Sequence, residues 1–491
     1  MPEARCPLAG RFFSLARVDG EAVALLGPDG RPTATRSALA QAALELSGEL
    51  RPCLPEARPV VLSLPNGERF VRAFLALRRI GAPVALVDAS APADELRRCA
   101  AAIGAGAVLA TPERISGQAV WDGDGLALGL PRDLPIVALP DGTVVLKLTS
   151  GSSGLPKAIA LSARQLAADG VQIMRTMGFG SGDVTLAAIP LTHSYGLGSC
   201  LLPLLLAGTP QTFPTCALPA ALAATLAASD VAHFPAVPAM IRALATLPRL
   251  PEFPHLRVVL AAGAPLAPRD ATAFHAATGR KVHVFYGSSE CGGITYDRSS
   301  APSHAPGAVG TPMARVDVEL VDGEGRVLPA GAEGRVRVRS RAVALAAIPT
   351  PEELVLAPGV FLTGDLGRFD AEGRLTLTGR VGETLNVAGK KVHPDEVRRV
   401  LEAIPGVASA VVTGLPDRHR GDLIAAVVAV EPGATLTVRA ILSACRERLA
   451  PHKLPRRVVL VDELPVSDRG KLRRDDLLAL FGAAEGTEPP R

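Results

Sequence analysis

One ten-residue segment, residues 148–157 with the sequence LTSGSSGLPK, constrains the fold of this chain more than any other. It lies between two apolar runs, residues 144–146 and 158–161. Its glycines allow close backbone approach, and its hydroxyls, amides and lysine favour an anion, so the loop suits a polyphosphate. It is not a Walker loop, because Pro156 precedes Lys157 and the next run is typical of a strand rather than a helix. A plain hairpin turn is the alternative that the loop alone leaves open.

Length and composition predict a multidomain globular protein. The chain has 491 residues, 48% of them hydrophobic and 20% charged, which is enough for two or more packed cores. A net charge of +4 and the lack of a basic, aromatic-rich arm make nucleic acid an improbable partner. No signal peptide or membrane span is expected, since the most apolar stretch, residues 197–207, is short and contains Pro203. Seven scattered cysteines without a CxxC pair indicate reduced thiols and a cytoplasmic location.

Strand and helix patterns alternate from residue 59 to about residue 285, which predicts an α/β domain with parallel strands and flanking helices. Helices are expected over residues 68–79, 93–102, 162–177, 197–206, 219–228, 239–245 and 268–278. Strands are expected over residues 60–62, 84–87, 107–110, 185–189, 231–234, 257–261 and 281–285. Asn66 is expected to cap the first of these helices.

The pattern changes near Pro302. Residues 309–341 and 360–377 alternate as in antiparallel strands, which predicts a β meander. Beyond residue 380, helices over 394–403 and 437–448 and strands over 407–413, 422–430 and 458–461 indicate a compact α+β domain. We therefore predict a large N-terminal domain of mixed and parallel sheets, residues 1–380, and a small C-terminal domain, residues 381–491.

Further candidate residues follow predicted strands, where open α/β sheets bind their ligands. Tyr286 begins the segment YGSSE, in which an aromatic ring, two hydroxyls and a carboxylate suit a base, a phosphate and magnesium. The segment TGD places Asp365 where its carboxylate can accept both hydroxyls of a ribose. Each segment is, by itself, more typical of a surface turn.

The order of these segments carries the stronger signal. LTSGSSGLPK, PLTHSYG, AAGAPL, YGSSE, TGDLG, GRVGETLNVAGKKVHPDEV and PVSDRGK follow one another from residue 148 to Lys471. The chain thereby resembles the adenylate-forming superfamily of acyl-CoA synthetases, amino-acid adenylation domains and luciferases. Such enzymes convert a carboxylate and ATP into acyl-AMP and pyrophosphate, and a thiol then takes the acyl group.

The resemblance implies a role for each motif residue. The β- and γ-phosphates of ATP are expected at the glycine loop, on Thr149, Ser150, Gly151, Ser152, Ser153, Gly154 and Lys157. The adenine and the α-phosphate are expected at Gly263, Ala264, Pro265, Tyr286, Gly287, Ser288 and Ser289. Glu290 is expected to bind Mg²⁺, whose charge offsets that of the phosphates. Asp365 and Arg380 are expected to bind the ribose.

The resemblance also implies a two-step cycle. Lys471 of the small domain is expected to stabilise the charge that develops during adenylation. Rotation near residues 380–383 is then expected to withdraw Lys471 and bring Gly389 to the pantetheine arm of CoA, which makes the small domain mobile. Gly382 and Asn386 depart from the charged residues common at these positions in the superfamily, which makes the switch looser and removes one contact of the second step.

The predicted substrate is a fatty or aryl carboxylic acid. His193 matches the position that acyl and aryl ligases use near the carboxylate, and no aspartate lies between Pro190 and Gly196 to bind an α-ammonium group. The basic residues Arg446, Arg448, Lys453, Arg456 and Arg457 suit either the phosphates of CoA or an acidic carrier protein, and are equally typical of a solvated surface.

The leading hypothesis is an acid–CoA ligase that uses ATP, Mg²⁺ and CoA. The alternative acceptor is the phosphopantetheine of a carrier protein, which ends in the same thiol arm. A nucleotide-binding protein without turnover is disfavoured because Lys471 and Glu290 are both present, and a phosphotransferase is disfavoured because it would not release pyrophosphate. A homodimer is a further possibility that no sequence feature specifies.

Overall fold

The computed structural model describes residues 7–55, 58–115, 117–131, 134–150, 156–349, 355–381, 385–387, 390–417, 421–464, 477 and 479–481. The chain divides into two compact units. Unit 1 comprises Met1–Glu319 and Arg337–Thr363, and unit 2 comprises Leu320–Val336 and Gly364–Arg491. The domain boundary predicted at residue 380 stays a prediction.

Unit 1 contains a sheet whose middle is parallel. Its strands run in the order β16 (Ala308–Pro312), β15 (Gly292–Tyr296), β14 (Val282–Ser288), β13 (Val258–Ala261), β12 (Val231–Ala236), β10 (Val184–Leu186), β11 (Gln211–Thr212), β1 (Val23–Leu26) and β2 (Pro32–Thr35). All neighbours from β14 to β1 pair in parallel. Antiparallel pairing begins at β15 on one side and at β2 on the other. The parallel strands therefore point their carboxyl ends to one edge of the sheet.

A second sheet of unit 1 contains the glycine-rich hairpin. Its order is β19 (Ala346–Ile348), β9 (Pro156–Ser162), β8 (Thr143–Ser150), β4 (Val84–Leu86), β3 (Val60–Ser63), β5 (Ala107–Ala110), β7 (Leu126–Gly129) and β6 (Trp121–Gly123). β8, β4, β3 and β5 pair in parallel, whereas β8 and β9 form an antiparallel hairpin. β20 (Val355–Ala357) pairs with β21 (Val360–Phe369), which leads into unit 2.

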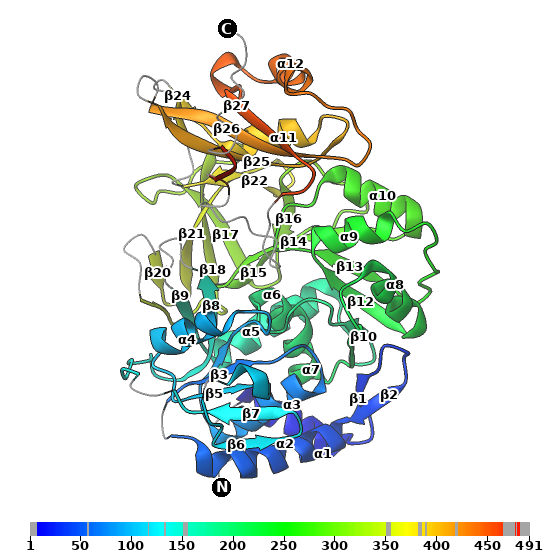
Figure 1. Ribbon diagram of the computed structural model, residues 1–491, viewed down its shortest axis with the longest axis vertical. Helices are drawn as coiled ribbons and strands as arrows, with labels where there is room; N and C mark the ends of the chain where they lie inside the picture. The colour runs from blue at the N-terminus through cyan, green and yellow to red at the C-terminus, as the bar shows by residue number, and fades with distance from the viewer. Residues whose placement is uncertain are drawn as a thin grey trace. The chain divides into compact units, whose positions relative to one another are not determined.

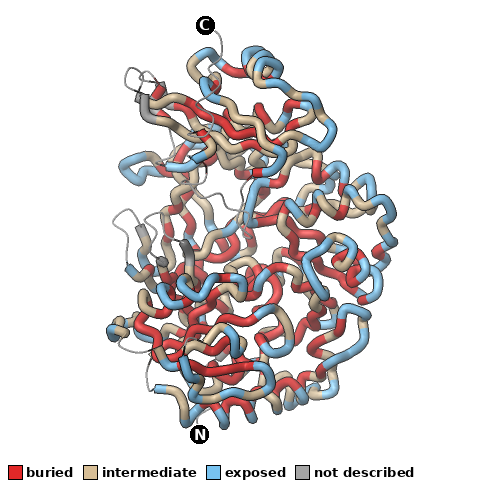
Figure 2. The backbone as a smooth tube through the Cα atoms, viewed as in Figure 1, coloured by how far each residue is buried: buried red, intermediate tan, exposed pale blue. Residues whose placement is uncertain are grey.

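Helices cover these sheets (Figure 1). They are α1 (Pro7–Val18), α2 (Arg36–Leu50), α3 (Glu68–Ile80), α4 (Ala93–Ala102), α5 (Ala163–Met177), α6 (Ser194–Gly196), a π-helical segment (Leu197–Leu201), α7 (Leu202–Ala207), α8 (Pro219–Ala228), α9 (Pro238–Ala245) and α10 (Pro268–Thr278). Alternate residues of the second sheet enter different cores, as period-2 burial requires. Val60 and Leu62 pack with α1, α2 and α3, while Val61 packs with α4. β3, β4, β7 and β12 are buried along their whole length, and Figure 2 shows long buried stretches of backbone inside unit 1.

Helix ends follow local chemistry in several places. Ser162 and Gln165 form a capping box at the start of α5, an arrangement that stabilises a helix by about 0.5–2 kcal/mol. α10 ends at Thr278 and is followed by Gly279, whose φ of 67° is the left-handed conformation that favours glycine. The prediction for Asn66 is wrong, because Gly67 precedes α3 without a side-chain cap. Asn66 instead donates to the carbonyls of Ala187 and Ile189 and accepts from the N–H of Leu191.

Unit 2 has its own sheet and cores. The sheet runs in the order β24 (Lys390–Val392), β23 (Leu385–Val387), β26 (Gly421–Val430) and β25 (Val407–Asp417), and β27 (Arg457–Val461) pairs with β26. Residues of α11 (Pro394–Glu402) and α12 (Val438–Arg448) pack in one core with this sheet. β22 (Leu375–Arg380) pairs with β21 in the same unit. β17 (Val316–Val321) and β18 (Glu333–Ser340) contain two of the points where the chain passes between units.

The predicted α/β class is confirmed by these parallel, helix-covered sheets. The bounds of α4, α8, α10 and β5 are the predicted ones, and the other predicted elements differ from the observed ones by a few residues. The sequence interpretation missed α1, α2 and the β1–β2 hairpin, which precede residue 59, and also the β6–β7 hairpin.

Candidate active site

The glycine loop joins the two strands of a hairpin, so the polyphosphate and hairpin interpretations are compatible. Thr149 pairs with Lys157 and Ser150 with Pro156 at the end of the β8–β9 ladder. Gly151, Ser152, Ser153 and Gly154 lie outside the described residues. The Nζ atom of Lys157 lies 2.9 Å from Oε1 of Glu290, although 133 residues separate them in sequence. The cation predicted for phosphate and the carboxylate predicted for magnesium are therefore neighbours.

Glu290 belongs to the turn between β14 and β15. Its N–H donates to Oγ of Ser288 (3.2 Å), and its carbonyl accepts from the N–H of Ala344 (2.7 Å). The hydroxyl of Ser289 lies 2.9 Å from that of Ser194 at the start of α6. The turn thus presents a hydroxyl and a carboxylate, while Tyr286 lies half-buried on β14 and Gly287 is exposed.

His193 pairs with a carboxylate that the sequence interpretation did not identify. Its Nε2 atom lies 2.8 Å from Oδ2 of Asp88, which follows β4. The N–H and hydroxyl of Ser90 also donate to Asp88. Burial alone would raise the pKa of the Asp88 carboxyl, but the hydrogen bonds from His193 and Ser90 outweigh burial and hold this pKa well below its usual range. Asp88 is therefore an ionised carboxylate that orients the imidazole.

Gly263, Ala264 and Pro265 follow β13 and are exposed. Gly263 has a φ of 88°, and a Cβ added there would meet no atom closer than 3.9 Å. The backbone of this segment is therefore open on that side, as a face that receives a flat ring requires. The predicted role in adenine binding stays a prediction.

Asp365 and Arg380 lie together in unit 2. They are partners in the β21–β22 register, and Nε of Arg380 donates to Oδ1 of Asp365 at 2.8 Å. Asp365 is largely buried while Arg380 is more than half exposed, so the guanidinium fixes the carboxylate from the solvent side. Of the remaining unit 2 predictions, Lys471 and Gly389 lie outside the described residues. Within the predicted basic cluster, Lys453 binds Glu396 at 2.6 Å, which occupies its ammonium group.

The candidate residues of unit 1 share one topological position. Asp88 follows β4, Gly263 follows β13, and Tyr286 and Glu290 lie at the end of β14 and just beyond it. Ligands of open α/β sheets bind at the carboxyl ends of the strands. The chain thus gathers a cation, a carboxylate, hydroxyls and an imidazole–carboxylate pair on residues that are far apart in sequence.

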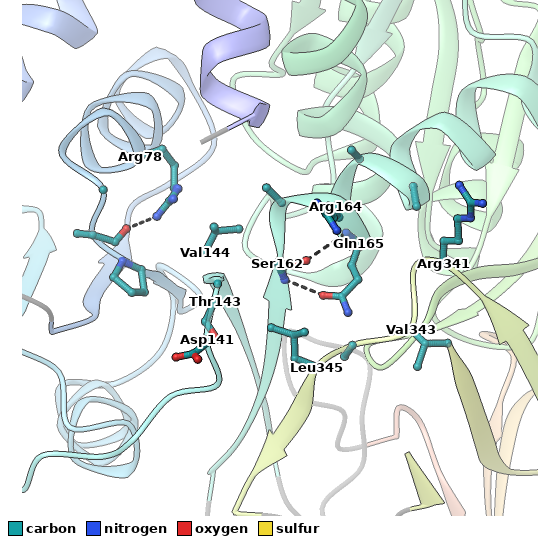
Figure 3. A pocket seen from close by; sticks show the side chains of 18 of the residues that line it. Arg78, Asp141, Thr143, Val144, Ser162, Arg164, Gln165, Arg341, Val343 and Leu345 are labelled. Carbon is teal, nitrogen blue, oxygen red and sulfur yellow. Dashed lines mark hydrogen bonds between the residues drawn. The ribbon is translucent and has the colours of Figure 1, made fainter. Parts of the chain in front are cut away.

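A large groove of unit 1 lies elsewhere (Figure 3). It is bordered by Thr143 and Val144 at the start of β8 and by Ser162 at the end of β9, the end of the hairpin opposite the glycine loop. Its walls include Arg78, Arg164 and Arg341. None of the predicted site residues lines it. The groove is therefore separate from the residues predicted to bind nucleotide.

Within the described ranges, no group of three or more His, Cys, Asp or Glu side chains could hold a metal ion by itself. No described helix is long and apolar enough to cross a membrane. The described cysteines form no disulfide, and burial raises the pKa of Cys291 to about 12, which makes it a poor nucleophile at neutral pH.

The fold and site define an enzyme that forms acyl adenylates. The chain belongs to the AMP-binding enzyme family, which matches residues 12–346, and the AMP-binding enzyme C-terminal domain matches residues 396–471.

Two curated relatives illustrate the range of this family. The chain is 29% identical to an oxalate–CoA ligase of Arabidopsis thaliana over 84% of this chain and 87% of the relative. It is 33% identical to the fatty acid–[acyl-carrier-protein] ligase ScoC of Streptomyces coeruleorubidus over 70% of this chain and 68% of the relative.

A solved structure extends the similarity to nearly the whole chain. The amide bond synthetase McbA of Marinactinospora thermotolerans is 28% identical, with a TM-score of 0.83 over 97% of this chain and 100% of McbA. The recognition of an adenylate-forming enzyme and the class of acid–thiol ligase are thereby confirmed.

Proposed function

We propose that this protein activates a fatty or aryl carboxylic acid with ATP and transfers the acyl group to the thiol of CoA. In the first step a carboxylate oxygen attacks the α-phosphorus, the bond to pyrophosphate breaks, and acyl-AMP forms. In the second step the thiol sulfur attacks the acyl carbon and AMP leaves. The observation that carries the proposal is the ion pair between Glu290 and Lys157, the last residue of the glycine-loop motif, in a member of the AMP-binding enzyme family.

The Lys157–Glu290 pair gives each of two largely buried charges a partner of opposite sign. Both side chains are at most one-fifth exposed, so an unpaired charge at either position would be costly. When the phosphates bind, the ammonium group of Lys157 pairs with their anionic oxygens, and the carboxylate of Glu290 becomes available to bind a cation. Each charge therefore serves two successive partners, first the other side chain and then the substrate.

Magnesium fits this site as an ion coordinated jointly by the protein and the substrate, rather than by protein side chains alone. Mg²⁺ is typically bound through one or two carboxylates together with substrate phosphates and water. Glu290 supplies one carboxylate, and the described residues around it provide no three-residue cage. The ion, when bound, would neutralise charge on the phosphates. Ser289 and Ser194, whose hydroxyls are 2.9 Å apart, would donate to the α-phosphate region beside it.

The acid substrate is proposed to lie near His193. The imidazole of His193 is paired with Asp88. His193 precedes α6, which leads into the π-helical segment, and all residues of the π-helical segment are buried. Tyr195 and Phe285 pack with ring centroids 5.6 Å apart in the same part of unit 1. These apolar rings favour an apolar acyl or aryl group over an α-amino acid. Feruloyl-CoA synthases are among the curated relatives, at 28% identity, which supports an aryl acid.

The remaining roles in the catalytic cycle rest on the sequence motifs. Lys471 is proposed to stabilise the adenylation transition state and Gly389 to line the path of the pantetheine arm. The Asp365–Arg380 pair is proposed to bind the ribose, and the hinge is proposed to begin at Arg380, where β22 ends. Homodimerisation and a cytoplasmic location stay predictions.

A second acceptor deserves a direct comparison, because ScoC, at 33% identity, is named for transfer to a carrier protein. CoA and a phosphopantetheinylated carrier protein end in the same thiol arm. The two acceptors differ in the group that carries the arm, which is a nucleotide in one case and a protein in the other. The protein surface around the entrance for the thiol arm therefore determines which of the two acceptors is used.

The test is pyrophosphate release with Mg·ATP across fatty, aryl, dicarboxylic and amino acids, without acceptor and then with CoA or a holo-carrier protein. We expect release with fatty or aryl acids and CoA-dependent thioester formation. Thioester on the carrier protein alone would transfer the proposal to the second acceptor. AMP release with an amino acid as the preferred substrate would contradict the proposed acid class.

A further inference from the structure

The turn between β14 and β15 contacts two buried ionisable side chains that none of the motifs contains. This turn, residues 288–293, carries the hydroxyl of Ser289 and the carboxylate of Glu290. Its outward contacts are to Ser194 and Lys157. Its inward contacts are to Lys147 of β8 and Asp169 of α5.

Lys147 approaches the first half of the turn. Its side chain is buried, with a residue exposure of 2%, and Nζ lies 3.5 Å from the carbonyl oxygen of Ser289. Lys147 lies on β8, two residues before Thr149, where the strand enters the glycine loop. Burial lowers the pKa of its ammonium group, and the charge of Asp169 is the main opposing influence. A lysine is therefore placed where the strand of the glycine loop meets the turn that carries Glu290.

Asp169 holds the second half of the turn. Its Oδ1 atom accepts from the N–H of Gly293 at 3.0 Å, and its residue exposure is 3%. A Cβ added to Gly292 would lie 2.2 Å from Oδ1 of Asp169, and Gly292 has a φ of 69°. Both the close contact and the left-handed backbone therefore require glycine at this position. A Cβ on Gly198 would lie 3.3 Å from Oδ2. The carboxylate thus fills a space that glycines leave open.

The two charges depend on each other electrostatically. A buried ion without a counterion is strongly destabilised, whereas an opposite charge nearby compensates part of the lost hydration. For both groups, burial disfavours the charged form and the other member of the pair favours it. Glu290 and Cys291 also face Lys147. Removal of one member therefore leaves the other unsupported beneath the turn.

We infer that Lys147 and Asp169 are positioning residues that clamp residues 288–293 from both ends, so that Ser289 and Glu290 stay aligned with Lys157 for Mg·ATP. This inference rests on the proposed function, because it gives Glu290 a role in nucleotide binding. Lys147 also links the two nucleotide-binding segments, since its strand leads into one and its ammonium group contacts the other. Neither residue touches substrate.

The experiment uses Lys147→Met, Asp169→Asn and the double variant in the full-length protein. Pyrophosphate exchange gives kcat and the KM values for ATP and Mg²⁺, and transfer from synthetic acyl-AMP to CoA reports the second step. We expect each single variant to lower kcat/KM for ATP by about 10–100-fold, the range for residues that orient a metal ligand. Transfer from supplied acyl-AMP should change less than about threefold, because residues that orient a metal ligand act on the metal-dependent step.

The double variant tests the coupling. If the two charges support each other, removing both should cost less than the product of the single losses, by about tenfold or more. Additive losses would overturn the inference, as would single variants with unchanged KM for ATP and Mg²⁺. Equal losses in both half-reactions would also overturn it, because they indicate general destabilisation. If the single variants do not fold, the KM for ATP of the double variant is compared with that of the wild-type protein, and an unchanged KM would overturn the inference.

Lys281→Met is the matched control. Lys281 lies immediately before β14, at the end of the hairpin opposite the turn, and its Nζ pairs with Asp297 at 2.8 Å with both side chains nearly buried. It should lower stability without changing the KM for ATP. If the wild-type protein exchanges no pyrophosphate with any acid, the proposed function fails. Calorimetric titration of Mg·ATP into the same variants then tests the clamp by itself, and unchanged affinity would overturn it.

Discussion

Replacing Glu290 by glutamine separates the structural and catalytic roles of the Lys157–Glu290 pair. Two unit charges 2.9 Å apart interact by about 6 kcal/mol at an effective dielectric constant of about 20. Lost hydration and side-chain entropy offset most of this attraction, so the net effect on stability should be about 1–3 kcal/mol. Lys157→Met should lower stability by a similar amount, because either change removes the same ion pair between two largely buried side chains.

The catalytic loss should exceed the loss of stability. Groups aimed at charge in a transition state typically contribute about 100- to 1,000-fold, or about 2.7–4 kcal/mol. Glu290→Gln should therefore lower the rate of pyrophosphate exchange by that factor and raise the Mg²⁺ concentration needed for half-maximal activity. Lys157→Met should raise the KM for ATP, since its charge is predicted to bind the phosphates.

The assay is pyrophosphate exchange at fixed acid with Mg²⁺ and ATP titrated separately, beside urea unfolding of each variant. The Lys157→Met/Glu290→Gln double variant should unfold at a urea concentration close to that of the single variants, because the pair is lost once. Its activity should be at least as low as that of the weaker single variant. An unchanged Mg²⁺ requirement in Glu290→Gln would refute the assignment of this carboxylate to the metal.

Other substitutions address the remaining groups. Asp88→Asn should lower kcat/KM by about 10–100-fold, because the His193 ring loses the carboxylate that orients it. Ser90→Ala removes only one donor to the same carboxylate and should lower kcat/KM much less. Equal effects of the two substitutions would contradict the orienting role. The depressed pKa of Asp88 stabilises the fold above about pH 4 and this contribution is lost as pH falls through the folded pKa, so acid unfolding of Asp88→Asn should show a weaker dependence on pH below 4 than wild type. Lys471→Ala should abolish adenylation and spare transfer from supplied acyl-AMP, and a similar loss in both steps would show that the lysine is not confined to the first.

Sequence patterns predicted the elements whose ends are set locally. α10 begins with Pro268 and ends before Gly279, and α8 also begins with a proline, so nearby residues determine these bounds. α2 was missed because Ala40, Ala43 and Ser47 interrupt the buried leucines of its inward face, which gives a weak periodic signal. The β1–β2 hairpin consists of four-residue strands with few large side chains.

The candidate site shows the same division. Lys157, Ser289 and Glu290 lie within short motifs, so their roles as candidate ligands can be predicted from neighbouring residues. Asp88 was missed because its partner His193 is 105 residues away, and Lys147 because the carbonyl it contacts is 142 residues away. Asn66 was assigned to a helix cap by a local rule, whereas its amide is used by backbone groups more than 120 residues distant. Contacts of this kind are created by the fold and have no local signature.

The most direct test of adenylate formation follows an oxygen atom. A carboxylic acid labelled with ¹⁸O in its carboxylate is incubated with the protein, Mg·ATP and CoA, and the nucleotide product is examined by mass spectrometry. We predict AMP carrying one ¹⁸O atom, because the carboxylate oxygen bonds to the α-phosphorus and leaves with AMP when the thioester forms. Label in inorganic phosphate together with ADP would show attack at the γ-phosphorus and contradict the account.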